Sequence, residues 1–216
     1  MYRQGPTRPV FRIVTSAGEA EEHLRVIRQA MERSTKHSTL SGLSGVAVGL
    51  IALGGCFLTR WGMREHAGEP LAKIEFVVIW AGVLLLSLIA DSLFTKRRAA
   101  RVGKTAFSPL GRHLWRAAAP GLFAAVVMSM FYATHPGLIG NYLYGIWMLC
   151  YAVSLLGVGM FSVREVSLLG WTFLAAGALT MLMPAQFFIG PQMMMALTFG
   201  GLHIAYGVYM GWQYGW

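Results

Sequence analysis

Six long apolar stretches occupy most of this chain of 216 residues from about residue 40 onward. A helix needs about 20 mostly apolar residues to cross the roughly 30 Å hydrocarbon core of a bilayer. In lipid, only helices and closed barrels satisfy their own backbone hydrogen bonds. The sequence therefore predicts an all-α membrane bundle of six transmembrane helices, at about residues 40–60, 75–94, 115–134, 140–161, 166–184 and 191–211.

The composition agrees with a membrane location. Charged residues make up 12% of the chain, against about 25% in a typical soluble domain. The first 37 residues are polar and basic rather than a cleavable secretory signal, so the first span is expected to act as an uncleaved anchor. Cys56 and Cys150 lie inside apolar stretches without a pairing motif, which predicts packed thiols.

Lysine and arginine are distributed very unevenly between the spans. Residues 1–40 contain seven, the segment after the first span three, the segment after the second span seven and the segment after the fourth span one. The positive-inside rule then places both termini in the cytoplasm, and we expect a multi-pass protein of the cell inner membrane. The net charge of +9 fits this topology and attraction to anionic lipids. No nucleic-acid-binding motif accompanies it, so no nucleic acid partner is predicted.

The segment before the first span has a pattern of its own. Residues 15–37 predict an amphipathic cytoplasmic helix that follows a disordered basic tail over residues 1–14. Ser16 and Glu19 have the spacing of a capping box, and Glu21 and Arg25 that of an ion pair. An apolar face repeats at helical spacing: Ala20, Leu24, Ile27 and Met31. This face lies on the bilayer or docks a soluble protein or a second copy of the chain.

The loop after the second span is long and strongly basic. It predicts a surface that binds anionic lipid headgroups or an acidic protein partner. Its basic residues are Lys96, Arg97, Arg98, Arg101, Lys104, Arg112 and Arg116.

Small residues recur at helical spacing in three spans. Such stripes let membrane helices approach closely. We expect them to pack the bundle internally, with homo-oligomer formation as the alternative. The glycines concerned are Gly42, Gly45 and Gly49 in the first span, Gly170 and Gly177 in the fifth, and Gly207 and Gly211 in the sixth.

Ionisable side chains inside a span are functional candidates by default, because their burial in hydrocarbon is costly. His203 lies near the middle of the sixth span, one turn from Tyr206, and either forms a structural hydrogen bond or contacts a ligand or a proton. Asp91 lies in the last turn of the second span and is expected to pair at the surface with one of the three basic residues at 96–98. No second histidine lies at the depth of His203, and no catalytic residue, metal site or cofactor is predicted.

Polar and aromatic residues also gather at the ends of the spans. The seven tryptophans lie mainly there, which is typical of the aromatic belts at the membrane interface. Asn141, with Tyr142 and Tyr144 beside it, lies at the outer end of the fourth span. Asn141 is a ligand candidate at the rim of an outward cavity or an interface anchor.

Two stretches carry a resemblance to a known group of proteins. Met31–Thr35 (MERST), followed by Leu40–Gly45 (LSGLSG), and Phe199–Ile204 (FGGLHI) resemble signatures of a family of uncharacterised bacterial multi-pass inner-membrane proteins. The resemblance implies a role in signalling but no established activity. The family's pattern has basic residues after the last span, whereas this chain ends in Trp212–Trp216 (WQYGW).

Two function classes follow from these observations. The favoured one is a non-enzymatic sensor or scaffold that acts through a cytoplasmic partner, presented by the amphipathic helix and the basic loop. The alternative is a small transporter or a binder of lipid or small molecules, with an intramembrane site around His203. The alternative requires a polar cavity between the second and sixth spans. A membrane enzyme is a third class, for which the sequence offers no catalytic constellation.

Overall fold

The computed structural model describes residue 18 and residues 21–25, 41–65, 71–101, 109–140, 142–182 and 190–214. Six helices in these ranges are long and apolar enough to cross a membrane, which confirms the predicted all-α membrane bundle. They cover Gly42–Gly62, Ile74–Arg101, Gly111–Thr134, Tyr142–Gly159, Arg164–Leu182 and Pro191–Tyr214.

The chain divides into two units, residues 1–36 and residues 37–216. In the first unit, residues 21–25 are helical, and Arg25 Nη1 lies 3.7 Å from Glu22 Oε2. This ion pair has a spacing of three residues, whereas the sequence predicted that Arg25 pairs with Glu21. The rest of the predicted amphipathic helix at 15–37, and the tail at 1–14, lies outside the described residues.

Proline and glycine set several helix boundaries in the second unit. Proline, whose missing N–H costs nothing at the first turn, begins α4, α5 and α8, and Gly140 ends α5 with a φ of 48°. The last span is one continuous helix made of α8, the π-helix η1 and α9. The element bounds are α2 Gly42–Glu65, α3 Leu71–Arg101, α4 Pro109–Thr134, α5 Pro136–Ile139, α6 Tyr142–Gly159, α7 Arg164–Leu182, α8 Pro191–Met195, η1 Ala196–Leu202 and α9 His203–Tyr214.

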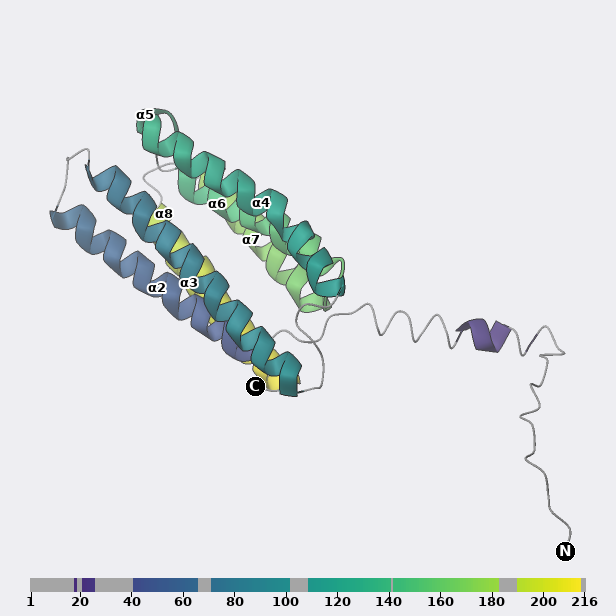
Figure 1. The fold of residues 1–216 in the computed structure, drawn as a ribbon. Helices are drawn as coiled ribbons and strands as arrows, with labels where there is room; N and C mark the ends of the chain where they lie inside the picture. Colours follow the sequence, from purple (N-terminus) through teal and green to yellow (C-terminus); the bar gives the residue numbers. More distant parts are fainter. Residues whose placement is uncertain are drawn as a thin grey trace, which may run out of the picture. The chain divides into compact units, whose positions relative to one another are not determined.

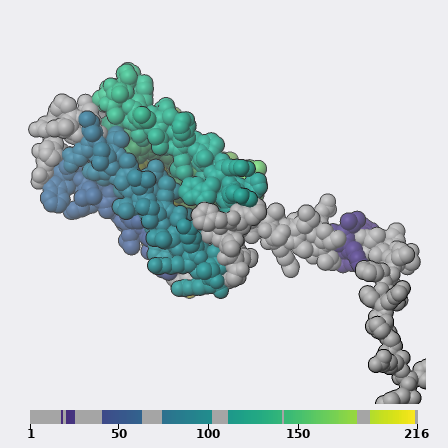
Figure 2. Space-filling model, in the orientation of Figure 1, coloured from purple at the N-terminus to yellow at the C-terminus, as the bar shows by residue number. Residues whose placement is uncertain are grey.

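The six spans form two groups of three helices (Figure 1). In the first helix group, α2 packs against α3 on one side and against the last span on the other. In the second helix group, α6 packs against α7 and α4. Although α3 and α4 follow each other in the chain, they belong to different groups and contact each other little. Figure 2 shows the face of the molecule on which these two helices lie side by side.

Glycines bring the first and last spans into backbone contact. A Cβ atom added to Gly45 would lie 2.7 Å from the Cα atom of Gly207, and one added to Gly207 would lie 2.7 Å from the carbonyl oxygen of Gly42. Gly42 and Gly211 meet in the same way, and a Cβ atom on Gly49 would lie 2.7 Å from the carbonyl oxygen of Gly200. The stripes of small residues in these two spans are thus used within the chain.

The second helix group also uses its small residues at helix contacts. Cβ atoms added to Gly170 and Gly177 of α7 would lie 3.0 Å from Leu156 and Leu149 of α6, respectively. On the other side of α6, Gly121 of α4 leaves no room for a side chain against the carbonyl oxygen of Cys150. Both α4 and α7 therefore pack closely against α6.

The basic residues after the second span lie on helices rather than in a long loop. With 31 residues, α3 is about 46 Å long at 1.5 Å per residue, and its last two turns extend past a hydrocarbon core of roughly 30 Å. We call this end of the bundle the basic end. It is defined by Lys96, Arg97, Arg98 and Arg101 on α3 and by Arg112 and Arg116 on α4, whereas Lys104 lies outside the described residues.

The basic end also joins three helices. The guanidinium group of Arg98 donates a hydrogen bond to the backbone carbonyl of Tyr214. The Tyr214 hydroxyl donates to Glu165 Oε1 at 3.2 Å. These bonds connect α3 and α9 of the first helix group to the start of α7 in the second.

Candidate functional site: a cavity between the two helix groups

A cavity of about 450 Å³ lies between the two helix groups and is lined by residues of all six spans. This volume falls within the range of about 300–1,000 Å³ that is typical of small-molecule sites. Its wall is mostly apolar and carries a few polar groups from different helices, and the cavity is partly open. It follows α3 and α4 along most of their length, from Val77 to Thr95 and from Gly111 to Met130.

One face of α3 provides much of the wall. Trp80, Leu84, Leu88, Asp91 and Thr95 all line the cavity. Their spacings of four, four, three and four residues place them on one side of an α-helix. Neighbouring residues of α3 point the other way, and Leu85 is 60% exposed on the lipid side. The face that α3 turns inward therefore carries a tryptophan near one end and a carboxylate near the other.

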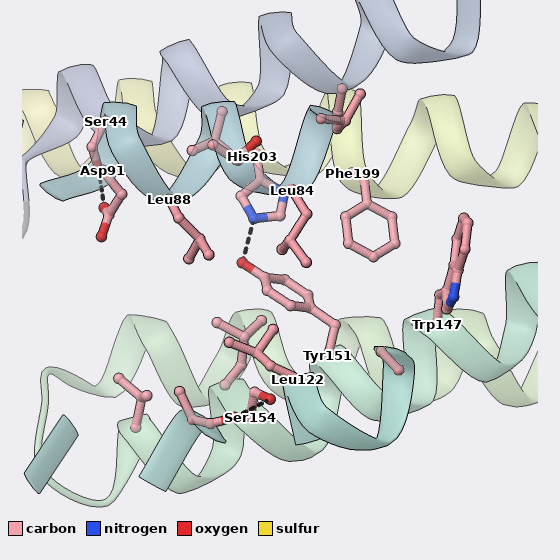
Figure 3. Close-up of a pocket in the computed structure, with 18 of the residues that line it drawn as sticks. Ser44, Leu84, Leu88, Asp91, Leu122, Trp147, Tyr151, Ser154, Phe199 and His203 are labelled. Atoms are coloured by element: carbon pink, nitrogen blue, oxygen red, sulfur yellow. Dashed lines mark hydrogen bonds between the residues drawn. The ribbon is translucent and has the colours of Figure 1, made fainter. Parts of the chain in front are cut away.

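A hydrogen bond in the middle of the cavity connects the two helix groups. His203 of α9 is only 3% exposed, and its Nε2 atom lies 2.8 Å from the hydroxyl of Tyr151 in α6 (Figure 3). The imidazole also packs against Phe173, with ring centroids 5.3 Å apart, and stacks on Phe199 at 6.1 Å. His203 thus has a structural partner, and both rings of the hydrogen-bonded pair line the cavity.

The turn of helix before His203 is a π-helix. Residues Ala196–Leu202 form η1, and Phe199 within it lies in the cavity wall. His203, which also lines the cavity, follows directly after η1. A π segment inserts extra backbone into an α-helix and is frequent at functional sites. The His203 Nδ1 atom is buried and has no hydrogen-bond partner among the described residues. The adjacent Gly200 and Gly201 were the one local signal in the sequence for an irregular helix.

Asp91 points into the cavity. Its Oδ1 atom accepts a hydrogen bond of 2.8 Å from the hydroxyl of Ser44 in α2 (Figure 3). The sequence predicted that Asp91 would pair at the surface with one of the basic residues at 96–98. Instead, its partner is a serine of the neighbouring helix, because the side chain turns toward α2 and the cavity rather than toward the basic end.

An aromatic cluster lies toward the end of the cavity away from Asp91. Trp80 and Trp147 are 7% and 8% exposed, and their ring centroids lie 5.5 Å apart. Trp147 Nε1 donates to Ser129 Oγ at 2.9 Å, and Phe76 stacks on the same indole at 5.5 Å. Trp80 Nε1 has no acceptor among the described residues. The aromatic-belt interpretation is therefore wrong for these two tryptophans, although Trp61, Trp115, Trp171 and Trp212 are exposed.

The cavity brings together three of the four predicted ligand candidates. His203, Asp91 and Tyr206 line it, whereas Asn141 lies outside the described residues. Ser44, Tyr151 and Trp80 were not predicted as site residues, because serines and aromatic residues inside a span look like ordinary packing residues until their neighbours are known. No group of three residues that could hold a metal ion is found in the part of the chain that the structure describes.

Comparisons with known proteins add no family to this picture. The sequence matches no protein-family model, no curated protein and no solved structure. The resemblance to bacterial inner-membrane proteins thus stays a prediction, and the function has to be argued from the geometry of the cavity.

Proposed function

We propose that this multi-pass membrane protein binds a small, largely apolar molecule in the cavity between its two helix groups, as a transporter or receptor of that molecule. The observation that carries the proposal is the cavity itself. It lies between the second and sixth spans and is lined by both Asp91 and His203. Its wall is mostly apolar, whereas the sequence led us to expect a polar cavity there, so the proposed ligand is largely apolar.

The composition of the wall supports this kind of ligand. Leu84 and Leu88 of α3 face Leu122 of α4 across the cavity (Figure 3). Apolar surface favours an apolar ligand body, while a few polar groups fix its orientation. Ser44, Asp91, Tyr151 and His203 are such groups, and they are already held by hydrogen bonds between helices.

The arrangement of α3 and α4 supports entry from the bilayer. Both helices line the partly open cavity, yet they contact each other little. Their outer faces carry large exposed apolar side chains, such as Leu85, Leu86 and Phe123. In a membrane these faces lie against lipid, so a molecule dissolved in the bilayer reaches the seam between the two helices directly.

Filling the middle of the cavity is expected to remove the bound molecule. Leu84→Trp places a large ring at the centre of the α3 face. Leu85→Trp makes the same change on the lipid side of the same turn, where the side chain is 60% exposed, and serves as the matched control. Native mass spectrometry of the three proteins, purified from the same membranes in mild detergent, measures the molecules retained per chain.

We expect wild type and Leu85→Trp to retain a lipid or small apolar molecule, and Leu84→Trp to lose at least nine tenths of it. Equal retention by all three proteins would place the bound molecules on the outer surface and contradict the proposal. A wild-type protein that carries nothing would also count against it.

The proposal includes the orientation of the bundle in the membrane. The basic end faces the cytoplasm of a cell with an inner membrane, because the segments with many lysines and arginines all fall on that side. The sensor or scaffold function favoured by the sequence analysis stays a prediction, since most of residues 15–37 lies outside the described residues. A bound molecule in the cavity is compatible with that function as the signal that is sensed.

A further inference from the structure

We propose that the ligand of the cavity is a lipophilic organic cation whose positive group lies beside Asp91. This inference rests on the proposed function and names the chemical class of the ligand. It follows from the charge of the cavity wall, from the aromatic residues in it, and from its length along α3.

The charge of the wall is unbalanced. Asp91 is the single acidic residue among the described residues that line the cavity, and no lysine or arginine is found there. One carboxylate oxygen accepts the hydrogen bond from Ser44, and the described residues include no ion-pair partner for this carboxylate. An ionised carboxylate in apolar surroundings is costly, so the group either takes up a proton or is accompanied by a cation. A positively charged ligand supplies that cation.

The position of the carboxylate fits this role. Figure 3 shows the Asp91 side chain in the space between the two helix groups, with Leu88 and then the hydrogen-bonded pair of His203 and Tyr151 farther along the cavity. The basic residues of α3 begin at Lys96, more than one turn beyond Asp91. A ligand therefore meets the carboxylate from within the cavity.

Aromatic residues provide the second feature of the site. Trp80, Trp147, Tyr151, Phe199 and Tyr206 all line the cavity. Aromatic faces attract organic cations and also pack well against apolar bodies. One carboxylate in a wall of aromatic rings is the combination that favours a hydrophobic amine, an alkylammonium ion or a phosphonium ion.

The inward face of α3 sets the length of the ligand that the cavity can hold. Asp91 and Trp80 are separated by about 16 Å along the helix axis at 1.5 Å per residue, and Leu84 and Leu88 lie between them on the same face. The site therefore suits a molecule with a cationic group at one end and an apolar body. A phospholipid or a fatty acid fits the apolar part of the cavity, but its phosphate or carboxylate would meet the like charge of Asp91.

The test uses three probes of different charge on the purified full chain. Tetraphenylphosphonium is the cation, tetraphenylborate is an anion of nearly the same shape, and N-phenyl-1-naphthylamine is a neutral apolar fluorophore. Equilibrium dialysis or fluorescence gives the affinity of each probe for wild type, with Leu84→Trp as the background for partitioning into detergent. We expect wild type to bind the cation at least tenfold more tightly than the anion, and to bind the neutral probe measurably.

Asp91→Asn is expected to weaken binding of tetraphenylphosphonium at least tenfold and to leave binding of the neutral probe within about twofold. Asp91→Glu keeps the charge and is expected to retain most of the affinity for the cation. Glu165→Gln removes a carboxylate outside the cavity and is expected to bind all probes like wild type. The comparison of cation with anion on wild type needs no folded variant at position 91.

The outcomes separate the two proposals. If wild type binds the neutral probe but does not prefer the cation to the anion, the cation inference fails and the proposed function stands. The same holds if a folded Asp91→Asn protein binds tetraphenylphosphonium like wild type. If wild type binds no probe above the Leu84→Trp background, both the inference and the proposed function fail.

Discussion

Replacing Gly207 with alanine is expected to lower the melting temperature of the purified protein by about 10 °C or more. The added Cβ atom would lie 2.7 Å from the carbonyl oxygen of Gly42, a distance that real Cβ atoms do not adopt. The neighbouring atoms are backbone and cannot rotate away, so α2 and α9 must separate. Overpacking typically costs about 1–3 kcal/mol and more where backbone must move, and about 3 kcal/mol corresponds to roughly 10 °C for a chain of this size.

Gly54→Ala is the matched control for this change. Gly54 lies in α2, the helix that Gly207 of α9 contacts, but a Cβ atom on Gly54 would meet nothing within 4 Å. Because alanine is a better helix former than glycine by up to about 1 kcal/mol, this variant is expected to melt at or slightly above the temperature of wild type. Thermal unfolding in one detergent, monitored by size-exclusion chromatography, gives the melting temperature of both variants and of wild type. Equal melting of Gly207→Ala and Gly54→Ala would show that the first and last spans do not pack at this interface.

The second large effect is expected from Tyr151→Phe. This change removes the hydroxyl that bonds His203 Nε2 at 2.8 Å and leaves that nitrogen buried without its partner. Hydrogen bonds between membrane helices contribute about 0.6 kcal/mol on average and up to about 1.7, and an unsatisfied buried group adds to the loss. We expect a destabilisation of about 1–2 kcal/mol, measured by reversible denaturation in mixed micelles.

Tyr209→Phe makes the same chemical change on α9, where the side chain is 49% exposed, and is expected to leave stability unchanged. A Tyr151→Phe protein as stable as wild type would mean that His203 does not depend on this bond. The ligand or proton role that the sequence analysis left open for His203 would then become the stronger interpretation.

The spans were predictable because they depend on a local property. A run of about 20 apolar residues identifies a membrane helix without knowledge of its neighbours, and all six predicted starts lie within four residues of the starts of the observed spans. The sequence placed the end of the second span too early. It counted the charged residues from Lys96 to Arg101 as loop, although long basic side chains at a helix end reach the headgroups while their backbone stays helical.

The cavity was predictable only in part, because its polar contacts join residues far apart in the chain. His203 and Asp91 stood out as ionisable groups inside spans. Their partners, Tyr151 and Ser44, are residue types that are common in membrane spans. They are recognised as partners only once the packing of α9 against α6 and of α3 against α2 is known. The π-helix at Ala196–Leu202 could not be predicted from hydrophobic periodicity, because a span that is apolar on all sides shows no periodic pattern that one irregular turn would change.

The contact between α2 and α9 has a consequence for the biogenesis of the protein. These two helices are the first and the last of the six spans to be synthesised, and four spans are inserted between them. Until the last span is inserted, the glycine face of α2 lacks its partner helix, and neither His203 nor Phe199 is present to complete the cavity wall. Insertion intermediates of this chain therefore lack the complete cavity, and under the proposed function a bound molecule would report a fully assembled bundle.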